Sequence, residues 1–168
     1  MTPKARAVPA PSDSALAPLH AGADLLDAYA VVLPPQVTAD LETLARAALG
    51  RQAWWIRALT RLRDAIMAPL GVKSSRAVGR AAAARGPVID FFPVLSRSAD
   101  ELVLGEDDRH LDFRVALLLR PVAAGGRELV AVTVVHCHNR LGRAYLVAIA
   151  PFHRVIVRAS LEQAARLP

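Results

Sequence analysis

The chain has 168 residues, of which 54% are apolar, and its mean hydropathy is +0.30. This length suffices for one well-packed core but not for two ordinary domains, so we expect a single domain over residues 19–168. The most apolar stretch, residues 141–157, contains Arg143 and Arg154. It therefore lacks the uncharged run of about 18–20 residues that a membrane-spanning helix needs, and we expect no membrane span.

Residues 1–18 are rich in proline and alanine and show no apolar period, which predicts a flexible tail. They also lack the continuous apolar run of a signal peptide. The lone Cys137 cannot form an internal disulfide, and no pair of cysteines or histidines has zinc-finger spacing. These features favour a cytoplasmic protein without a bound metal or other cofactor.

The net charge of +6 is distributed unevenly along the chain. Residues 46–85 carry nine basic side chains against Asp64 alone, whereas residues 98–112 carry six acidic side chains against Arg109. A basic segment can attract nucleic acid or anionic lipid. Ordinary solvated faces are the commoner cause of such asymmetry, so we expect nucleic acid not to be the partner.

The first half of the chain predicts one strand followed by two helices. Residues 29–33 are β-prone and end at two prolines, which cannot donate backbone hydrogen bonds. Thr38 is the candidate N-cap of a helix that ends at Gly50. A second helix is predicted by a stripe of apolar residues at helical spacing: Trp55, Leu59, Leu62, Ile66 and Leu70. Residues 72–86 have little to bury and predict a linker or flap.

The second half predicts antiparallel strands and a long C-terminal helix. Turn-forming residues, Gly125 and Gly126 among them, separate four β-prone runs: residues 88–97, 101–104, 109–120 and 128–138. Residues 139–166 predict a helix with Asn139 as N-cap, kinked but not ended by Pro151. The whole pattern predicts an α+β fold in which the last helix lies across a curved antiparallel sheet.

Five stretches resemble one bacterial family of domains of unknown function. They are residues 27–31, 92–97, 104–114, 139–145 and 151–154. These stretches and their order resemble the DUF2867 family, and the resemblance covers about residues 24–161. The family has no established activity, so the resemblance implies no catalytic residues. Its order of elements is similar to the START-like (SRPBCC) helix-grip fold, whose members hold lipids, sterols or polyketides in a cavity. The resemblance thus implies a sheet wrapped around the last helix.

Polar and apolar residues alternate on the two longest predicted strands. If the glycine turn pairs these strands with their apolar faces together, Cys137 falls in the core and a polar cluster forms on the opposite face: His110, Asp112, Arg114, His136 and His138. Three histidines and a carboxylate could bind a divalent metal or perform acid–base catalysis. The more ordinary interpretation is a partly wet polar face, and we expect no stoichiometric metal.

The space between the last helix and the sheet is the natural place for a pocket. Its predicted lining is Trp55, Leu59, Phe92, Phe113, Val115, Tyr145, Ile149 and Phe152. We expect an apolar or amphipathic small molecule to bind there. One alternative is an enzyme that uses the histidine cluster. Another is a basic partner-binding module in which Trp54, Arg57, Arg61 and the arginines of the last helix contact nucleic acid or anionic lipid.

Overall fold

The computed structural model of the chain describes residues 3–50, 83–84, 86–90, 92–123 and 125–168. The second predicted helix lies outside these residues, and with it the pocket residues Trp55 and Leu59. Trp54, Arg57 and Arg61 of the partner-binding hypothesis also lie outside them, as does most of the predicted linker.

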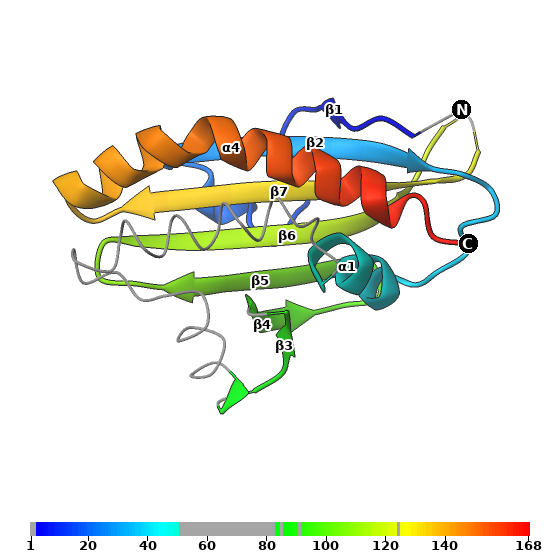
Figure 1. Cartoon of the computed structure of the whole chain (residues 1–168), viewed down its shortest axis with the longest axis horizontal. Coiled ribbons are helices and arrows are strands. Elements are labelled where there is room, and N and C mark those ends of the chain that lie inside the picture. The colour runs from blue at the N-terminus through cyan, green and yellow to red at the C-terminus, as the bar shows by residue number, and fades with distance from the viewer. Residues whose placement is uncertain (1–2, 51–82, 85, 91, 124) are drawn as a thin grey trace.

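A seven-stranded antiparallel sheet is the base of the fold (Figure 1). Its spatial order is β1-β2-β7-β6-β5-β4-β3. The strands are β1 Arg6–Ala7, β2 Leu25–Leu33, β3 Val88–Ile89, β4 Phe92–Arg97, β5 Glu101–Asp107, β6 Leu111–Pro121 and β7 Arg127–Cys137. Consecutive strands from β3 to β7 lie side by side, which confirms the predicted meander.

Two described helices lie on one face of this sheet, which we call the front face (Figure 1). The long helix α4, Arg140–Ala164, runs over β2 and β7, and α1, Leu41–Gly50, packs against its C-terminal part. A short 3-10 helix, Ala17–Leu19, belongs to the N-terminal segment. The predicted α+β class, with a long C-terminal helix on an antiparallel sheet, is confirmed.

The pairing of β6 with β7 follows the register that burial predicts. Leu111, Phe113, Val115, Leu117 and Leu119 stand opposite Cys137, Val135, Thr133, Ala131 and Leu129, so that the alternating faces coincide. Gly125 and Gly126 make the turn with φ of +85° and +92°. This left-handed region is open to glycine and costly for other residues, which explains why the hairpin turns here.

Helix caps account for where the two helices begin. Asn139 caps α4 as predicted, because its side chain accepts a hydrogen bond from the Gly142 N–H at 3.0 Å. The expected cap of α1 was Thr38, but Asp40 holds this position, since its carboxylate accepts from the Thr43 N–H at 2.8 Å. α4 continues through Pro151 without ending.

The N-terminal segment is not the undocked tail that its composition predicted. β1 pairs with β2, and the Ser14 hydroxyl donates to Glu101 at 2.6 Å. Ala5 and Leu16 are 2% and 3% exposed. The prediction from composition failed for two reasons. A strand at a sheet edge is held by backbone hydrogen bonds and needs few apolar residues. A single apolar residue such as Leu16 can be buried without an apolar period around it.

The opposite face of the sheet, which we call the back face, is also largely apolar. Its buried residues are Ala28, Ala30, Val103, Ala116, Leu118, Val130, Val132 and Val134, and Leu16 of the N-terminal segment packs on them. The expectation of a wet polar outer face on β6 and β7 is therefore wrong over most of their length. It holds only toward the two ends of the strands, where Asp112 stands opposite His136 and Arg120 stands opposite Glu128.

Candidate functional site

One row of side chains interrupts the apolar front face beneath α4. The strand register places Leu104, Val115, Thr133 and Asp27 next to one another on β5, β6, β7 and β2. Thr133 and Asp27 are direct cross-strand partners, so their Cβ atoms lie roughly 5 Å apart on the same face. A hydroxyl and a carboxylate thus lie side by side in this polar row, on a sheet face that is mostly apolar, with Glu106 opposite Phe113 as a further polar residue.

The described residues form two apolar clusters on the front face, one toward each end of α4. The larger cluster, around Leu104, Leu117, Ala131 and Tyr29, joins α1 and the C-terminal end of α4 to the sheet. The smaller cluster of Val135, Cys137 and Leu146 packs with Leu25, Leu111, Phe113 and Ile149 at the other end of α4. Val115, Thr133 and Asp27 belong to neither cluster of the described residues. The two clusters meet where the ring of Phe92, which packs on the larger one, contacts the ring of Phe113, which packs on the smaller one.

A histidine from α4 reaches down to the polar row. His153 Nε2 lies 3.2 Å from Asp27 Oδ1, and the two side chains are only 20% and 15% exposed. The second carboxylate oxygen of Asp27, Oδ2, is buried without a hydrogen-bond partner, and so is the hydroxyl oxygen of Thr133. Thr133 itself is 3% exposed. Two buried polar atoms are thus left without partners beneath the helix.

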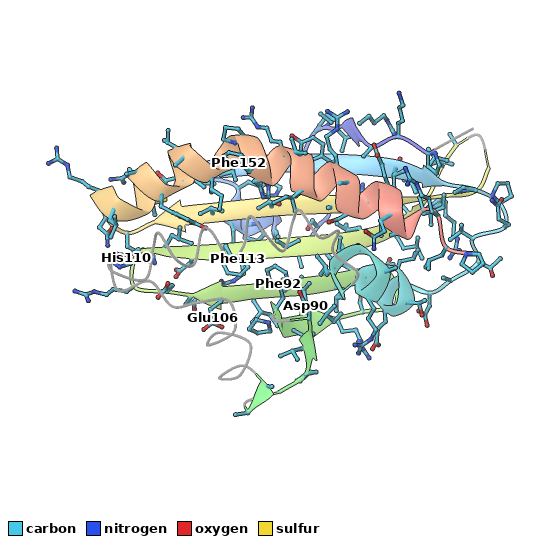
Figure 2. All side chains as sticks on the ribbon, in the orientation of Figure 1. Asp90, Phe92, Glu106, His110, Phe113 and Phe152 are labelled. Carbon is cyan, nitrogen blue, oxygen red and sulfur yellow. The ribbon has the colours of Figure 1, made fainter. Side chains whose placement is uncertain are left out.

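Several of the predicted lining residues lie beside this row. Phe113 and Ile149 pack in the same cluster, and the rings of Phe92 and Phe113 meet edge to face with centroids 5.8 Å apart. Phe152 on α4 is half exposed. Figure 2 shows Phe113 and Phe92 on the strands that α4 leaves uncovered, with Phe152 above them on the helix. Val115 and Tyr145 are partly buried.

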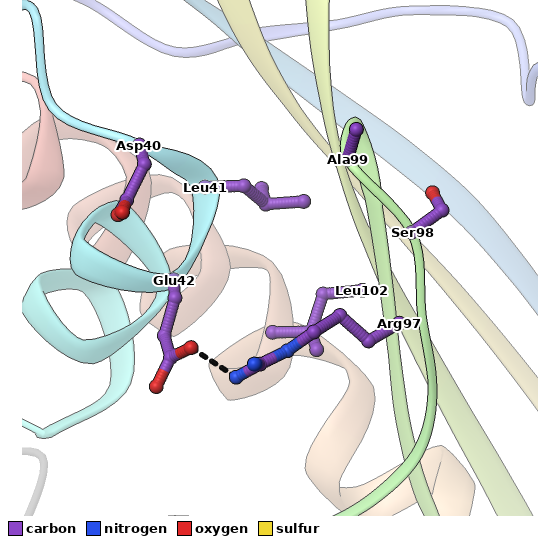
Figure 3. Close-up of a pocket in the computed structure, with 7 residues that line it drawn as sticks. All are labelled: Asp40, Leu41, Glu42, Arg97, Ser98, Ala99 and Leu102. Atoms are coloured by element: carbon purple, nitrogen blue, oxygen red, sulfur yellow. Dashed lines mark hydrogen bonds and ion pairs between the residues drawn. The ribbon is translucent and has the colours of Figure 1, made fainter.

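Two shallow pockets formed by described residues lie elsewhere. One, of about 190 Å³, lies between the start of α1 and the β4–β5 turn, where Glu42 and Arg97 form an ion pair (Figure 3). The other, of about 180 Å³, lies between Leu33, Pro34 and Arg127 near the glycine turn. Neither contains a residue of the predicted lining or of the predicted histidine cluster.

A family described as "Protein of unknown function (DUF2867)" matches residues 19–160, which is most of the chain. The chain belongs to the DUF2867 family. The match begins before β2 and ends near the end of α4, so it spans strands β2 to β7 and most of the helix that covers them. No curated protein and no solved structure matches the chain significantly.

Two of the stretches that resemble DUF2867 proteins meet for structural reasons. Residues 139–145 dock on residues 104–114, because the Asn139 side chain bonds His110 Nδ1 at 3.0 Å and caps α4. A Cβ atom on Gly142 would lie 2.1 Å from the His110 carbonyl oxygen, so only glycine fits there. These residues join the start of α4 to the sheet.

Two other DUF2867-like stretches meet at the polar row. Asp27 begins residues 27–31, and His153 belongs to residues 151–154. Sequence analysis named neither as a site residue, although a signal was present: Asp27 falls in an apolar strand, and His153 lies on the helix face that also carries Leu146 and Ser160. At the Asn139 contact, His110 Nε2 is buried without a partner, and at the Asp27–His153 contact the same is true of Asp27 Oδ2 and of Thr133 Oγ1 beside it.

The residues of the predicted histidine cluster bond different partners. Asp112 pairs with His138 at 2.9 Å, whereas His136 Nε2 lies 2.9 Å from the Leu19 carbonyl oxygen. Arg114 pairs with Asp107, and His110 bonds the N-cap of α4. The strand register places Asp112 directly opposite His136, and the His138 N–H donates to the His110 carbonyl oxygen, so these residues are neighbours. The N-terminal segment and α4 each hold one of the histidine side chains. Among the described residues, no three His, Cys, Asp or Glu side chains are arranged to hold a metal ion.

Cys137 is a buried core residue of this DUF2867 domain, as predicted. Burial raises the pKa of its thiol, and the neighbouring carboxylate of Asp24 raises it further. Asp24 accepts a hydrogen bond from the Cys137 N–H at 2.7 Å and pairs with Arg143 at 3.3 Å. The Cys137 N–H, and after it Arg143, lowers the pKa of Asp24. Asp24 thus ties β2 to β7 and to α4.

Among the described helices, α4 is long and apolar enough, by length and composition alone, to cross a membrane. The core helix of a soluble protein has the same properties. In the structure α4 lies along β2 and β7, with Leu146 and Leu161 buried. Its composition therefore fits a helix that packs on a sheet as well as one that spans a bilayer.

Proposed function

We propose that this DUF2867 domain binds an apolar or amphipathic small molecule on its front face, between α4 and strands β4 to β6. The observation that supports this most is the pair of buried polar atoms without partners in the polar row, Asp27 Oδ2 and Thr133 Oγ1. Phe113 lies two residues from Val115 of this row, its ring contacts that of Phe92, and Phe152 on α4 is half exposed. Aromatic side chains with accessible apolar surface beside a few convergent polar groups are typical of ligand sites.

The architecture gives this proposal a second, weaker support. An antiparallel sheet with a long C-terminal helix across it is similar to the START-like helix-grip arrangement, in which the ligand lies between helix and sheet. The enzyme alternative has less support, because two of its histidines are engaged outside the cluster: His136 by the Leu19 carbonyl oxygen and His110 by the Asn139 side chain.

The proposal can be tested with N-phenyl-1-naphthylamine, a neutral probe whose fluorescence rises in apolar surroundings. We expect saturable binding to the full chain with one probe per chain, and a rise in melting temperature by mass action. Phe113→Trp should weaken binding about tenfold, because the larger ring fills space where the probe lies.

A matched control is Val32→Trp, which adds the same ring to an exposed back-face position of β2. It should leave the affinity for the probe unchanged. Binding that does not saturate, or equal effects of the two tryptophan variants, would contradict the proposal.

A further inference from the structure

We infer that Asp27 and Thr133, with His153, form the polar end of the front-face site and bind a hydroxyl group of the ligand. The inference rests on the proposed function and names the class of ligand, an amphipathic alcohol or phenol. It is carried by two unpaired buried atoms, Oδ2 of Asp27 and Oγ1 of Thr133.

The two atoms are placed to act on one ligand group. Asp27 and Thr133 are cross-strand partners on the same face, roughly 5 Å apart at Cβ, and a group between them is within hydrogen-bond reach of both. His153 holds Oδ1 of Asp27 from above. It therefore determines which carboxylate oxygen stays available.

Burial makes the unpaired state costly. A buried polar atom without a partner loses its hydration and gains nothing in return, and native proteins leave few such atoms. Thr133 could carry valine, which has the same shape and a high preference for strands. A hydroxyl at this position is explained if a ligand completes its hydrogen bonds.

The chemistry of the two atoms selects the ligand group. A carboxylate oxygen only accepts hydrogen bonds, whereas a threonine hydroxyl both donates and accepts. A ligand hydroxyl can donate its proton to Asp27 Oδ2 while its oxygen accepts from Thr133 Oγ1. A ligand carboxylate or phosphate has no proton to donate and is repelled by Asp27. The apolar body of the alcohol would extend from Val115 toward Phe113.

The test compares 1-decanol with decanoate, which differ only at the polar end, as competitors of N-phenyl-1-naphthylamine on the full chain. We expect decanol to displace the probe at a concentration about tenfold lower than decanoate, since a hydrogen bond to a charged group is gained in one case and lost in the other. The net charge of +6 favours anions in general, so the preference is best judged against variants.

Asp27→Asn should abolish the preference for decanol, because an amide can present an N–H to the carboxylate of decanoate. Thr133→Val should weaken decanol about fivefold and leave decanoate nearly unchanged. The matched control is Asp24→Asn, which removes a carboxylate just before β2 and outside the polar row. This variant should keep the wild-type preference for decanol.

The outcomes separate this inference from the proposed function. If none of the three compounds binds saturably, the proposed function fails. If the probe binds but the ratio of decanol to decanoate affinity is the same in wild type, Asp27→Asn and Asp24→Asn, only the inference fails. If Asp27→Asn does not fold, the selective effect of Thr133→Val on decanol decides.

Discussion

Thr133 is the clearest case of a residue whose polar group lowers the stability of the folded protein. It is 3% exposed, its neighbours across the sheet are Val115 and Asp27, and its oxygen has no partner among the described residues. A core position of this kind normally carries an aliphatic side chain. Threonine here is the choice expected where ligand binding and stability compete.

We therefore expect Thr133→Val to raise the free energy of unfolding by about 1 kcal/mol, because it removes a buried, unpaired hydroxyl and keeps the side-chain shape. Urea denaturation followed by circular dichroism measures the change. A suitable comparison is Val135→Thr two residues along the same strand, which should lower stability. A loss of stability in Thr133→Val would show that the hydroxyl is already satisfied in the free protein.

At the scale of single residues, sequence reasoning placed Phe113 and Ile149 together but missed the contact between Asp27 and His153. Phe113 and Ile149 share a cluster as predicted, because strand and helix periods determine which residues face each other. Asp27 and His153 are separated by most of the chain, and no local pattern states that α4 crosses β2 at this point. Only the order of strands in the sheet brings them together.

The β6–β7 hairpin shows how far a local signal can determine an element. Alternating apolar residues and two adjacent glycines predicted the strands, the turn and the shared faces, and the structure confirms all three. The boundary between β3 and β4 was missed, because the run of residues 88–97 gives no glycine to mark its turn. Asp90 makes that turn with a φ of +56°, a conformation that aspartate adopts more readily than most residues.

The glycine turn supplies a test at this scale. Gly125→Val and Gly126→Val should each lower the free energy of unfolding by about 1–2 kcal/mol, because a left-handed backbone conformation is sterically unfavourable for valine. Nothing lies within 4 Å of an added Cβ at either glycine, so crowding does not contribute. Gly50→Ala is the control, since Gly50 ends α1 without positive φ and also has open space around it. Equal stability of all three variants and the parent would contradict the turn geometry.

On the scale of the whole molecule, the N-terminal segment completes the fold. The back face of the sheet exposes a broad apolar surface unless Leu16 and its neighbours cover it. Sequence analysis predicted one covered face because helices were expected on one side only. It could not predict the second layer, since that layer consists of irregular chain with scattered apolar residues.

Leu16→Ala should lower the free energy of unfolding by about 2–4 kcal/mol, as is usual when a fully buried leucine is truncated. Leu19→Ala is the matched control, because Leu19 lies three residues away in the same segment but is 39% exposed; its effect should stay within about 0.5 kcal/mol. Equal effects of the two substitutions in thermal unfolding would mean that the segment does not seal the back face in solution.

The central claim is that a ligand lies on the front face with its hydroxyl at the polar row. Methyl NMR of the chain during titration with 1-decanol tests this most directly. The account predicts saturable shifts for the methyl groups of Thr133, Val115 and Ile149, and none for Val130, Val132 and Val134, whose side chains point to the back face. Shifts confined to the back-face valines, or saturable shifts that leave Thr133 unchanged, would contradict it.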